Sequence, residues 1–194
     1  MLQRYCLLFF FAMLLFSVQT SIKAAVVVLQ HPVSLKAETI AHLRQVHASE
    51  DSKWQLVVFG FTHCKDFCPV SLANLALLVK AAANEQIMLE GIFITVDPDR
   101  DSDLILANYT KSFGSNINYL RFEGESLERL KAAFGVEVTY YTKNAGNQLN
   151  YQVDHSTSAF LIDPEGKIRI IFDAVNDAES ISKMFHEEKD MFKP

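Results

Sequence analysis

Two apolar runs separated by a helix-like segment are the feature that most limits the possible folds of this chain. The runs are WQLVVFGF, at residues 54–61, and IMLEGIFITV, at residues 87–96. Apolar runs of this length are typical of strands that are buried on both faces. Between them, residues 70–86 are rich in Leu and Ala, contain no Gly and follow Pro69, which suits a first helical turn. The pattern predicts a strand–helix–strand unit at the centre of an α/β fold.

The rest of the chain predicts further helices and strands around this unit. Helices are expected at residues 36–51, 104–114, 126–135 and 177–192, with Ser126 as an N-cap and Gly114 and Gly135 as C-terminal glycines. Strands are expected at residues 119–122, 159–163 and 167–173, and a β-hairpin at residues 136–153 with KNAGNQ as its turn. This order predicts one domain, residues 25–194, in which a mixed sheet is flanked by helices on both faces.

The first 24 residues differ from the rest of the chain. Arg4 precedes the apolar run LLFFFAMLLFSV, and the small and polar QTSIKAA follows it. This order is that of a secretory signal, and the run is shorter than the about 20 residues that a membrane-spanning helix needs. We therefore expect cleavage after Ala24, with an uncleaved membrane anchor through residues 5–18 as the alternative. Cleavage would remove Cys6 and leave Cys64 and Cys68 in the mature chain.

The stretch FGFTHCKDFCPVSL, at residues 59–72, places Cys64 and Cys68 directly after the first predicted strand. Sites in open α/β sheets lie at the carboxyl ends of strands. If the helix begins near Cys64, both sulfurs share one helix face, because residues i and i+4 lie together. The helix N-terminus, Lys65 and His63 would all favour the thiolates. Because thiolates serve both soft metals and disulfide exchange, this stretch predicts reactive cysteines without choosing between the two. A passive disulfide is the third reading, although closing so short a loop stabilises little.

Six histidines of the mature chain could join the two thiols at a soft metal ion. Four of them lie in polar contexts and are expected at the surface: His31, His42, His47 and His186. His63 adjoins Cys64, but neighbouring side chains usually point apart, so we expect it to support a site indirectly. His155 lies between the predicted hairpin and a strand, where a loop could fold over the cysteine helix. Its local context alone is that of an ordinary loop histidine.

Three motifs together resemble the SCO/SenC family of copper-binding, thioredoxin-like proteins. They are FGFTHCKDFCP, VDPDRDS and YQVDHSTSAFLIDPEG, which occur in the family's order between about Trp54 and Phe172. This resemblance covers most of the mature chain and implies a thioredoxin-like fold. It also implies that copper is held by Cys64, Cys68 and His155; Cu(I) is the expected state and Cu(II) the alternative, since the sequence leaves the oxidation state open. The implied function is delivery of copper to the binuclear CuA centre of cytochrome c oxidase, or reduction of the cysteines of that centre.

The resemblance also assigns roles to residues around these three. Asp66 would support the site or dock a partner, and Asp154 would orient His155 through a hydrogen bond. The middle motif would be structural or partner-facing, and it supplies Asp97, Pro98, Arg100 and Asp101. Two departures stand out. Lys65 replaces the family's proline and would favour the Cys64 thiolate, and residues 36–51 look helical where the family usually has a glycine-containing hairpin.

The sequence thus predicts a metallochaperone that is exported to the periplasm, anchored to a membrane facing it, or located in the mitochondrial intermembrane space of a eukaryote. Its expected partner is the CuA-bearing oxidase subunit or another envelope copper or thiol client, and we expect a monomer. The alternative is an envelope thiol–disulfide oxidoreductase or redox sensor that uses Cys64 and Cys68 without metal. The net charge of −5 and the absence of a basic run argue against nucleic acid as a partner.

Overall fold

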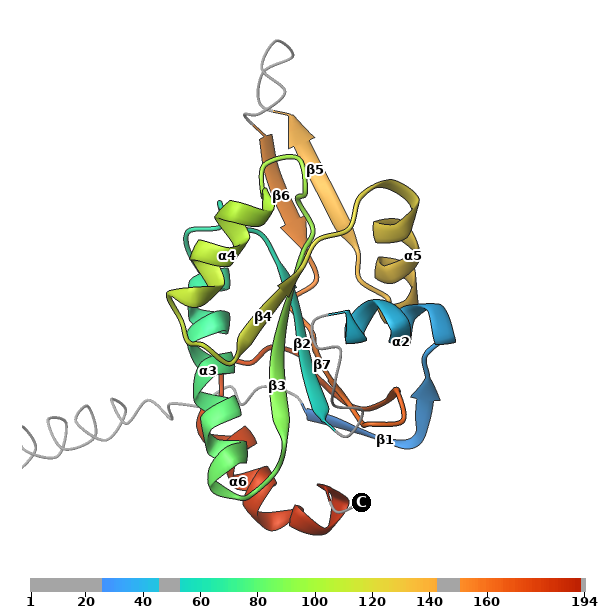
Figure 1. Ribbon diagram of the computed structural model, residues 1–194, viewed down its shortest axis with the longest axis vertical. Helices are drawn as coiled ribbons and strands as arrows, with labels where there is room; N and C mark the ends of the chain where they lie inside the picture. The colour runs from blue at the N-terminus through green and yellow to red at the C-terminus, as the bar shows by residue number, and fades with distance from the viewer. Residues whose placement is uncertain (1–25, 46–52, 143–150, 193–194) are drawn as a thin grey trace, which may run out of the picture.

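The computed structural model describes residues 26–45, 53–142 and 151–192 and shows a mixed six-stranded sheet with helices on both faces (Figure 1). The strand order is β1-β8-β7-β2-β3-β4. The strands are β1 (Val26–Ser34), β2 (Trp54–Gly60), β3 (Leu89–Thr95), β4 (Ile117–Leu120), β7 (Ala159–Ile162) and β8 (Lys167–Phe172). Strands β2, β3 and β4 are parallel, whereas β7 pairs antiparallel with β2 and β8, and β1 antiparallel with β8. The predicted α/β class with a mixed sheet is confirmed.

Two hydrophobic cores lie on opposite faces of this sheet. The helices that cover it are α2 (Ala37–Arg44), α3 (Phe67–Asn84), α4 (Asp103–Lys111), α5 (Gly124–Phe134) and α6 (Ala178–Glu187), and the short 3-10 helix η1 (Lys189–Phe192) follows α6. Leu56 and Val58 of β2 point into the core that contains α3, α4 and α6. Val57 and Phe59 point into the core that contains α2 and α5. Because side chains alternate along a strand, β2 must be apolar on both faces, which explains its apolar run.

A second, two-stranded sheet projects beyond the carboxyl ends of β2, β3 and β4 (Figure 1). It is the predicted hairpin, formed by β5 (Val138–Thr142) and β6 (Tyr151–His155) in antiparallel register. Its predicted turn, residues 143–148, lies outside the described residues. The hairpin brings a late segment of the chain to the end of the sheet where the cysteine motif lies.

Several details differ from the sequence-based predictions. Helix α4 ends at Lys111, before the expected Gly114, and β4 begins two residues before the expected strand. Helix α3 begins at Phe67, so Cys64 precedes it. Helix α5 begins at Gly124 with Glu123 as its N-cap, whereas Ser126 was expected there, and its predicted end at Gly135 is confirmed by a left-handed φ of 63°. Strand β1 was not predicted, although its valines favour a strand; Pro32 interrupts it, and proline is tolerated at a sheet edge or a bulge, both of which β1 has. The predicted leader, residues 1–24, lies outside the described residues.

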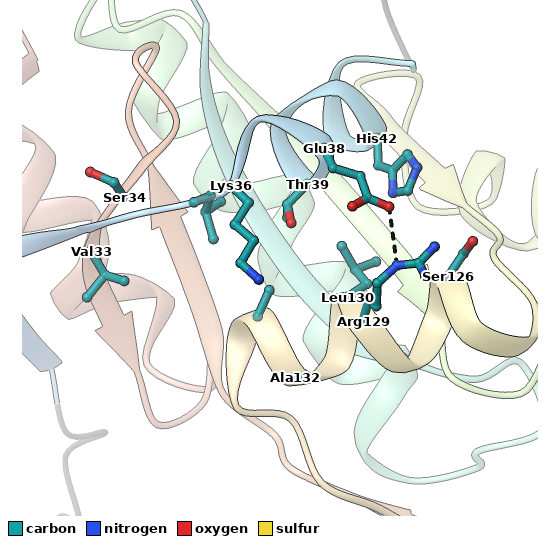
Figure 2. Close-up of a pocket in the computed structure, with 12 residues that line it drawn as sticks. Val33, Ser34, Lys36, Glu38, Thr39, His42, Ser126, Arg129, Leu130 and Ala132 are labelled. Carbon is teal, nitrogen blue, oxygen red and sulfur yellow. Dashed lines mark ion pairs between the residues drawn. The ribbon is translucent and has the colours of Figure 1, made fainter.

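A groove between α2 and α5 is separate from the cysteine motif (Figure 2). It has a volume of about 330 Å³. An ion pair crosses it, in which Arg129 Nε lies 3.2 Å from Glu38 Oε1. Because both side chains are about half exposed, this pair adds little to stability, and the two helices are held mainly by Leu43, Leu130 and Phe134 in the core.

Helix α3 alone among the helices of the described residues has the length and hydropathy of a membrane span. Leu72, Leu75 and Leu78 of this helix are nonetheless completely buried in the core. The apolar character of α3 is therefore that of a central helix packed between the sheet and α6.

Helix α3 offers a matched pair of neighbouring leucines that tests this packing. Leu78 is 0% exposed and Leu77 is 57% exposed. Leu78→Ala should lower the free energy of unfolding by about 2–5 kcal/mol, because it leaves a cavity in the core. Leu77→Ala should change it by less than about 0.5 kcal/mol, and urea denaturation of both variants measures the difference. Equal losses would contradict the placement of α3.

Candidate functional site

Cys64 and Cys68 lie in the connection between β2 and α3. The N–H of Cys64 donates to the carbonyl of Phe61, at 3.3 Å, in the turn after β2. Cys68 is the second residue of α3 and is buried, and its N–H lies 3.5 Å from Cys64 Sγ. The sulfur of Cys64 therefore caps the helix N-terminus. The expectation that both cysteines share one helix face is wrong, because α3 begins at Phe67, after Cys64.

The two cysteines are free thiols with opposite shifts in acidity. Partial burial raises the pKa of Cys64, but the N–H groups of Cys68, Asp66 and Phe67 and the Cys68 thiol outweigh it and hold the pKa below its ordinary value of 9.0. Burial raises the pKa of Cys68 to about 12, and the neighbouring charges of Cys64 and Asp101 act in the same direction. Cys64 is thus the thiol that ionises first.

His155, the last residue of β6, meets Cys68 from the other side of the site. Its Nε2 lies 3.8 Å from Cys68 Sγ, and its Nδ1 lies 2.8 Å from the carbonyl oxygen of Ser156. A carbonyl can only accept, so Nδ1 carries the proton and Nε2 presents its lone pair to the thiol. Burial lowers the pKa of His155, which keeps the ring neutral near pH 7. Asp154 is exposed, and it is the Ser156 carbonyl that orients the ring in its place.

Cys68 thus contacts both of the other predicted ligands, Cys64 and His155. Within the described ranges, no three His, Cys, Asp or Glu side chains stand in the arrangement of a closed metal site. Cys68 contacts Cys64 through both its N–H and its thiol, and it contacts His155 through its Sγ. The structure therefore brings Cys64 and His155 close to Cys68 from two sides.

The remaining histidines have other surroundings. His31 and His186 are exposed, as expected, and His186 Nδ1 lies 3.0 Å from Glu85 Oε1. The ring of His42 is half-buried against Phe122 at 4.9 Å. His63 is about half exposed, and its Nδ1 lies 3.6 Å from Asp101 Oδ1. The prediction for His47 lies outside the described residues.

Asp101 holds the start of the cysteine connection in place. Its buried carboxylate accepts hydrogen bonds from the Thr62 N–H at 3.0 Å, the Thr62 hydroxyl at 2.5 Å and the Thr95 hydroxyl at 2.6 Å. Thr62 follows β2 and Thr95 ends β3. Asp101 of the middle motif is therefore structural, because it ties together the ends of two central strands.

The other charged residues of the middle motif anchor the hairpin that carries His155. Arg100 Nε pairs with Asp97 Oδ2 at 2.5 Å, and its Nη1 donates to the Tyr151 carbonyl at 3.0 Å. The Arg100 guanidinium also lies over the Tyr151 ring, 3.9 Å from its centroid. The Tyr151 hydroxyl donates to Asp97, and the Tyr140 hydroxyl donates to the carbonyl of Val96. We refer to Asp97, Arg100 and Tyr151 as the hairpin anchor.

Two further supporting residues, like Thr62, Thr95, Tyr151 and Ser156, were not identified from the sequence. Gly60 leaves room for the site, since a Cβ there would lie 2.7 Å from the Phe93 ring and 3.0 Å from Cys68 Sγ. Phe61 packs edge-on against His155, with ring centroids 5.8 Å apart. The glycine inside an otherwise apolar run was a signal of close approach that could have been used.

Comparison with known proteins assigns the family. A sequence profile described as SCO1/SenC matches residues 43–189. The chain belongs to the SCO1/SenC family. A bovine relative, "Protein SCO2 homolog, mitochondrial", is 31% identical over 146 residues, which are 73% of this chain and 54% of that protein. This SCO1/SenC chain thus spans about half the length of the curated relatives that it matches.

Solved structures agree with the family assignment. A crystal structure of ScoI from Arabidopsis thaliana with copper bound has a TM-score of 0.67 and 25% identity, and the match covers 84% of this chain and 98% of that one. A crystal structure of yeast Sco1 with copper bound has a TM-score of 0.65 and 29% identity, and covers 73% of this chain and 78% of that one. The thioredoxin-like fold that the motifs imply is confirmed.

The hairpin anchor of this SCO1/SenC protein can be tested by removing one hydroxyl. Tyr151→Phe deletes the hydrogen bond to Asp97 and keeps the ring beneath Arg100, so amide hydrogen exchange in β6 should accelerate about tenfold or more. Tyr141→Phe, on the neighbouring strand and exposed, is the matched control and should leave exchange unchanged. Mass spectrometry measures the exchange rates. If Tyr151→Phe exchanges at the wild-type rate, its hydroxyl does not hold the hairpin.

Proposed function

We propose that this SCO1/SenC protein is a copper metallochaperone in which Cys64, Cys68 and His155 hold the metal for transfer. The observation that carries the proposal is the approach of His155 Nε2 to Cys68 Sγ, 3.8 Å apart in space and 87 residues apart in sequence. The copper-bound relatives support it, since their fold matches this chain over most of its length. The three residues converge although His155 lies in a different motif from the two cysteines.

The donor set suits a soft ion. Two thiolates and one imidazole are the ligands that Cu(I) favours, and the hydrogen bond from His155 Nδ1 to Ser156 leaves Nε2 as the donor atom. Because the pKa of Cys68 is about 12, this thiol keeps its proton at neutral pH and must release it when copper binds. A Cys64–Cys68 disulfide would offer no thiolate, so loading depends on a reducing step.

The proposed client is the CuA centre of cytochrome c oxidase, as the family resemblance implies. The proposed location is the periplasm, or the intermembrane space in a eukaryote, with residues 1–24 as a signal peptide or membrane anchor. We further propose that the carrier is monomeric and that it carries Cu(I), with Cu(II) as the second state to examine.

Anaerobic titration with Cu(I) tests the three-ligand site. Wild type should bind a single ion, and His155→Ala should lower the affinity by at least about 100-fold, since losing even an outer hydrogen bond to a ligand costs about 10–100-fold. Cys64→Ser and Cys68→Ser should each abolish tight binding. His186→Ala, an exposed histidine on α6, is the control and should bind as wild type does. Undiminished affinity in His155→Ala would exclude the three-ligand site.

The difference between the two thiols favours a second candidate, metal-free thiol–disulfide exchange or redox sensing. Cys64, with the lowered pKa, would attack a disulfide, and Cys68, with its pKa near 12, would resolve the mixed disulfide. The cap on the Cys64 sulfur by the Cys68 N–H stabilises the thiolate that this reaction needs.

The pH dependence of metal-free exchange tests the second candidate. The reactive thiolate accumulates as pH rises through the Cys64 pKa, so the rate of reduction of a model disulfide should increase with pH and reach its half-maximum below pH 9.0. Cys64→Ser should abolish the reaction, and His155→Ala should leave it unchanged. No turnover without metal, or a midpoint above pH 9.0, would count against thiol exchange.

A further inference from the structure

A groove runs between the hairpin and the cysteine connection. It has a volume of about 500 Å³, and Cys64 lies in its wall. Phe67, which is 63% exposed, and Tyr141, which is 54% exposed, flank it from α3 and β5. Residues 151–154 of β6 form its opposite side. We refer to this space as the Cys64 groove.

Strand β6 faces the Cys64 groove with its edge. Consecutive side chains of a strand point to opposite faces, so a lining that includes four consecutive residues indicates that the strand's edge borders the groove. Strand β6 is paired with β5 on its other side and, within the residues described, with no further strand. One row of its backbone groups therefore lies toward the groove.

The ladder between β5 and β6 identifies these backbone groups. The N–H of Ser156 donates to the carbonyl of Glu137 at 3.1 Å, so Ser156 belongs to a hydrogen-bonded pair. Such pairs alternate along an antiparallel ladder, which turns Gln152 and Asp154 toward β5 and turns Tyr151, Val153 and His155 away from it. The hydrogen bond from Arg100 to the Tyr151 carbonyl agrees with this alternation, because that carbonyl points away from β5. The N–H and C=O of Val153 remain directed toward the groove.

We propose that the Cys64 groove binds an extended, cysteine-bearing segment of a partner protein, which adds a strand to β6 by pairing with Val153 and places its cysteine beside Cys64. A free strand edge recognises an extended backbone, and side-chain pockets beside it provide selectivity. The proposal rests on the proposed function, because a thiol in the partner is needed whether copper or a disulfide is transferred.

The walls of the groove indicate what else the segment carries. Phe67 and Tyr141 offer exposed aromatic surface, which favours apolar residues next to the partner's cysteine. Lys65, Asp66 and Asp154 place both signs of charge around the groove. The segment is therefore selected by its backbone and its apolar side chains more than by net charge.

A pair of isomeric peptides tests strand addition. Each has seven residues with a central cysteine activated as the 2-pyridyl disulfide, and Cys64 of the Cys68→Ser protein attacks the peptide sulfur, forms a mixed disulfide and releases pyridine-2-thione. One isomer carries N-methyl groups on the residues directly before and after the cysteine, and the other carries them two residues away on each side. Alternate N–H groups of a strand face opposite edges, so the isomers block different edges.

One isomer should react about tenfold more slowly than the other, the loss expected for one or two backbone hydrogen bonds. Tyr141→Ala in the same background should slow the faster peptide several-fold without changing the rate with 2,2′-dipyridyl disulfide, which has no backbone. Leu77→Ala, an exposed leucine of α3 outside the groove, should match the parent with both reagents. Equal rates for the two isomers would overturn the proposal.

A measurement on wild-type protein covers the case that Cys68→Ser does not fold. With serine in place of the peptide cysteine, NMR titration should shift the amides of Val153 and His155 more than those of Gln152 and Asp154, which face β5. Equal shifts along β6, or none, would overturn strand addition. Neither experiment uses copper, so the two proposals can fail separately. A failed copper titration with a positive peptide result would refute the metal site and leave the groove proposal standing. Copper binding with a negative peptide result would refute the groove proposal and leave the metal site standing.

Discussion

The buried carboxylate of Asp101 is the interaction on which the candidate site depends. A charge removed from water is tolerated only when it is well hydrogen-bonded. The Asp101 carboxylate accepts three hydrogen bonds from donors of Thr62 and Thr95. Through these bonds the carboxylate fixes the segment after β2 relative to the end of β3. The Cys64 turn and the start of α3 follow directly, so the position of both sulfurs derives from this junction. Gly60 then leaves the space that the Cys68 thiol occupies.

The residue before Asp101 makes the complementary connection. Arg100 pairs with Asp97 and extends to the backbone and ring of Tyr151, which belongs to the strand that ends at His155. Two adjacent side chains of one short loop therefore place the cysteines and the histidine relative to each other. This explains why the middle motif accompanies the two others although none of its side chains is among the proposed ligands. A hairpin with only two strands is marginally stable alone, and the anchor supplies the tertiary contacts that it needs.

The unequal thiols suit both of the chemistries that we propose for the site. The helix start stabilises the Cys64 thiolate, whereas the buried Cys68 stays protonated until a metal or a disulfide replaces its proton. A half-buried, acidic thiol beside an open groove can meet an incoming group first, and the buried Cys68 can complete the reaction. Backbone groups of β6 line the opposite side of that groove. The hairpin would thus contribute both the ligand His155 and a docking edge, which is formed by the alternate backbone groups of β6 that point away from β5.

Much of the fold follows from the sequence by itself. The two apolar runs determine a central strand–helix–strand unit, the hairpin follows from its alternating pattern, and the position of Cys64 and Cys68 after a strand locates the site. These signals are local. A strand buried on both faces is apolar throughout and a strand buried on one face alternates apolar and polar residues, and a short segment is enough to show either pattern. His155 could be named as a partner only through the family motifs, since its own surroundings in the sequence do not distinguish it.

The tertiary structure decided how these parts meet. The cap of Cys64 on α3, the Ser156 carbonyl that sets the His155 tautomer and the anchor from Arg100 to Tyr151 depend on where chain segments end and cross. Lys65 illustrates the difference: the sequence offered the helix N-terminus, Lys65 and His63 as reasons for an acidic Cys64, whereas in the folded protein the N–H groups at the helix start and the Cys68 thiol account for the lowered pKa. Periodicity fixes which side of an element is buried, but hydrogen bonds between distant segments exist only after the chain has folded.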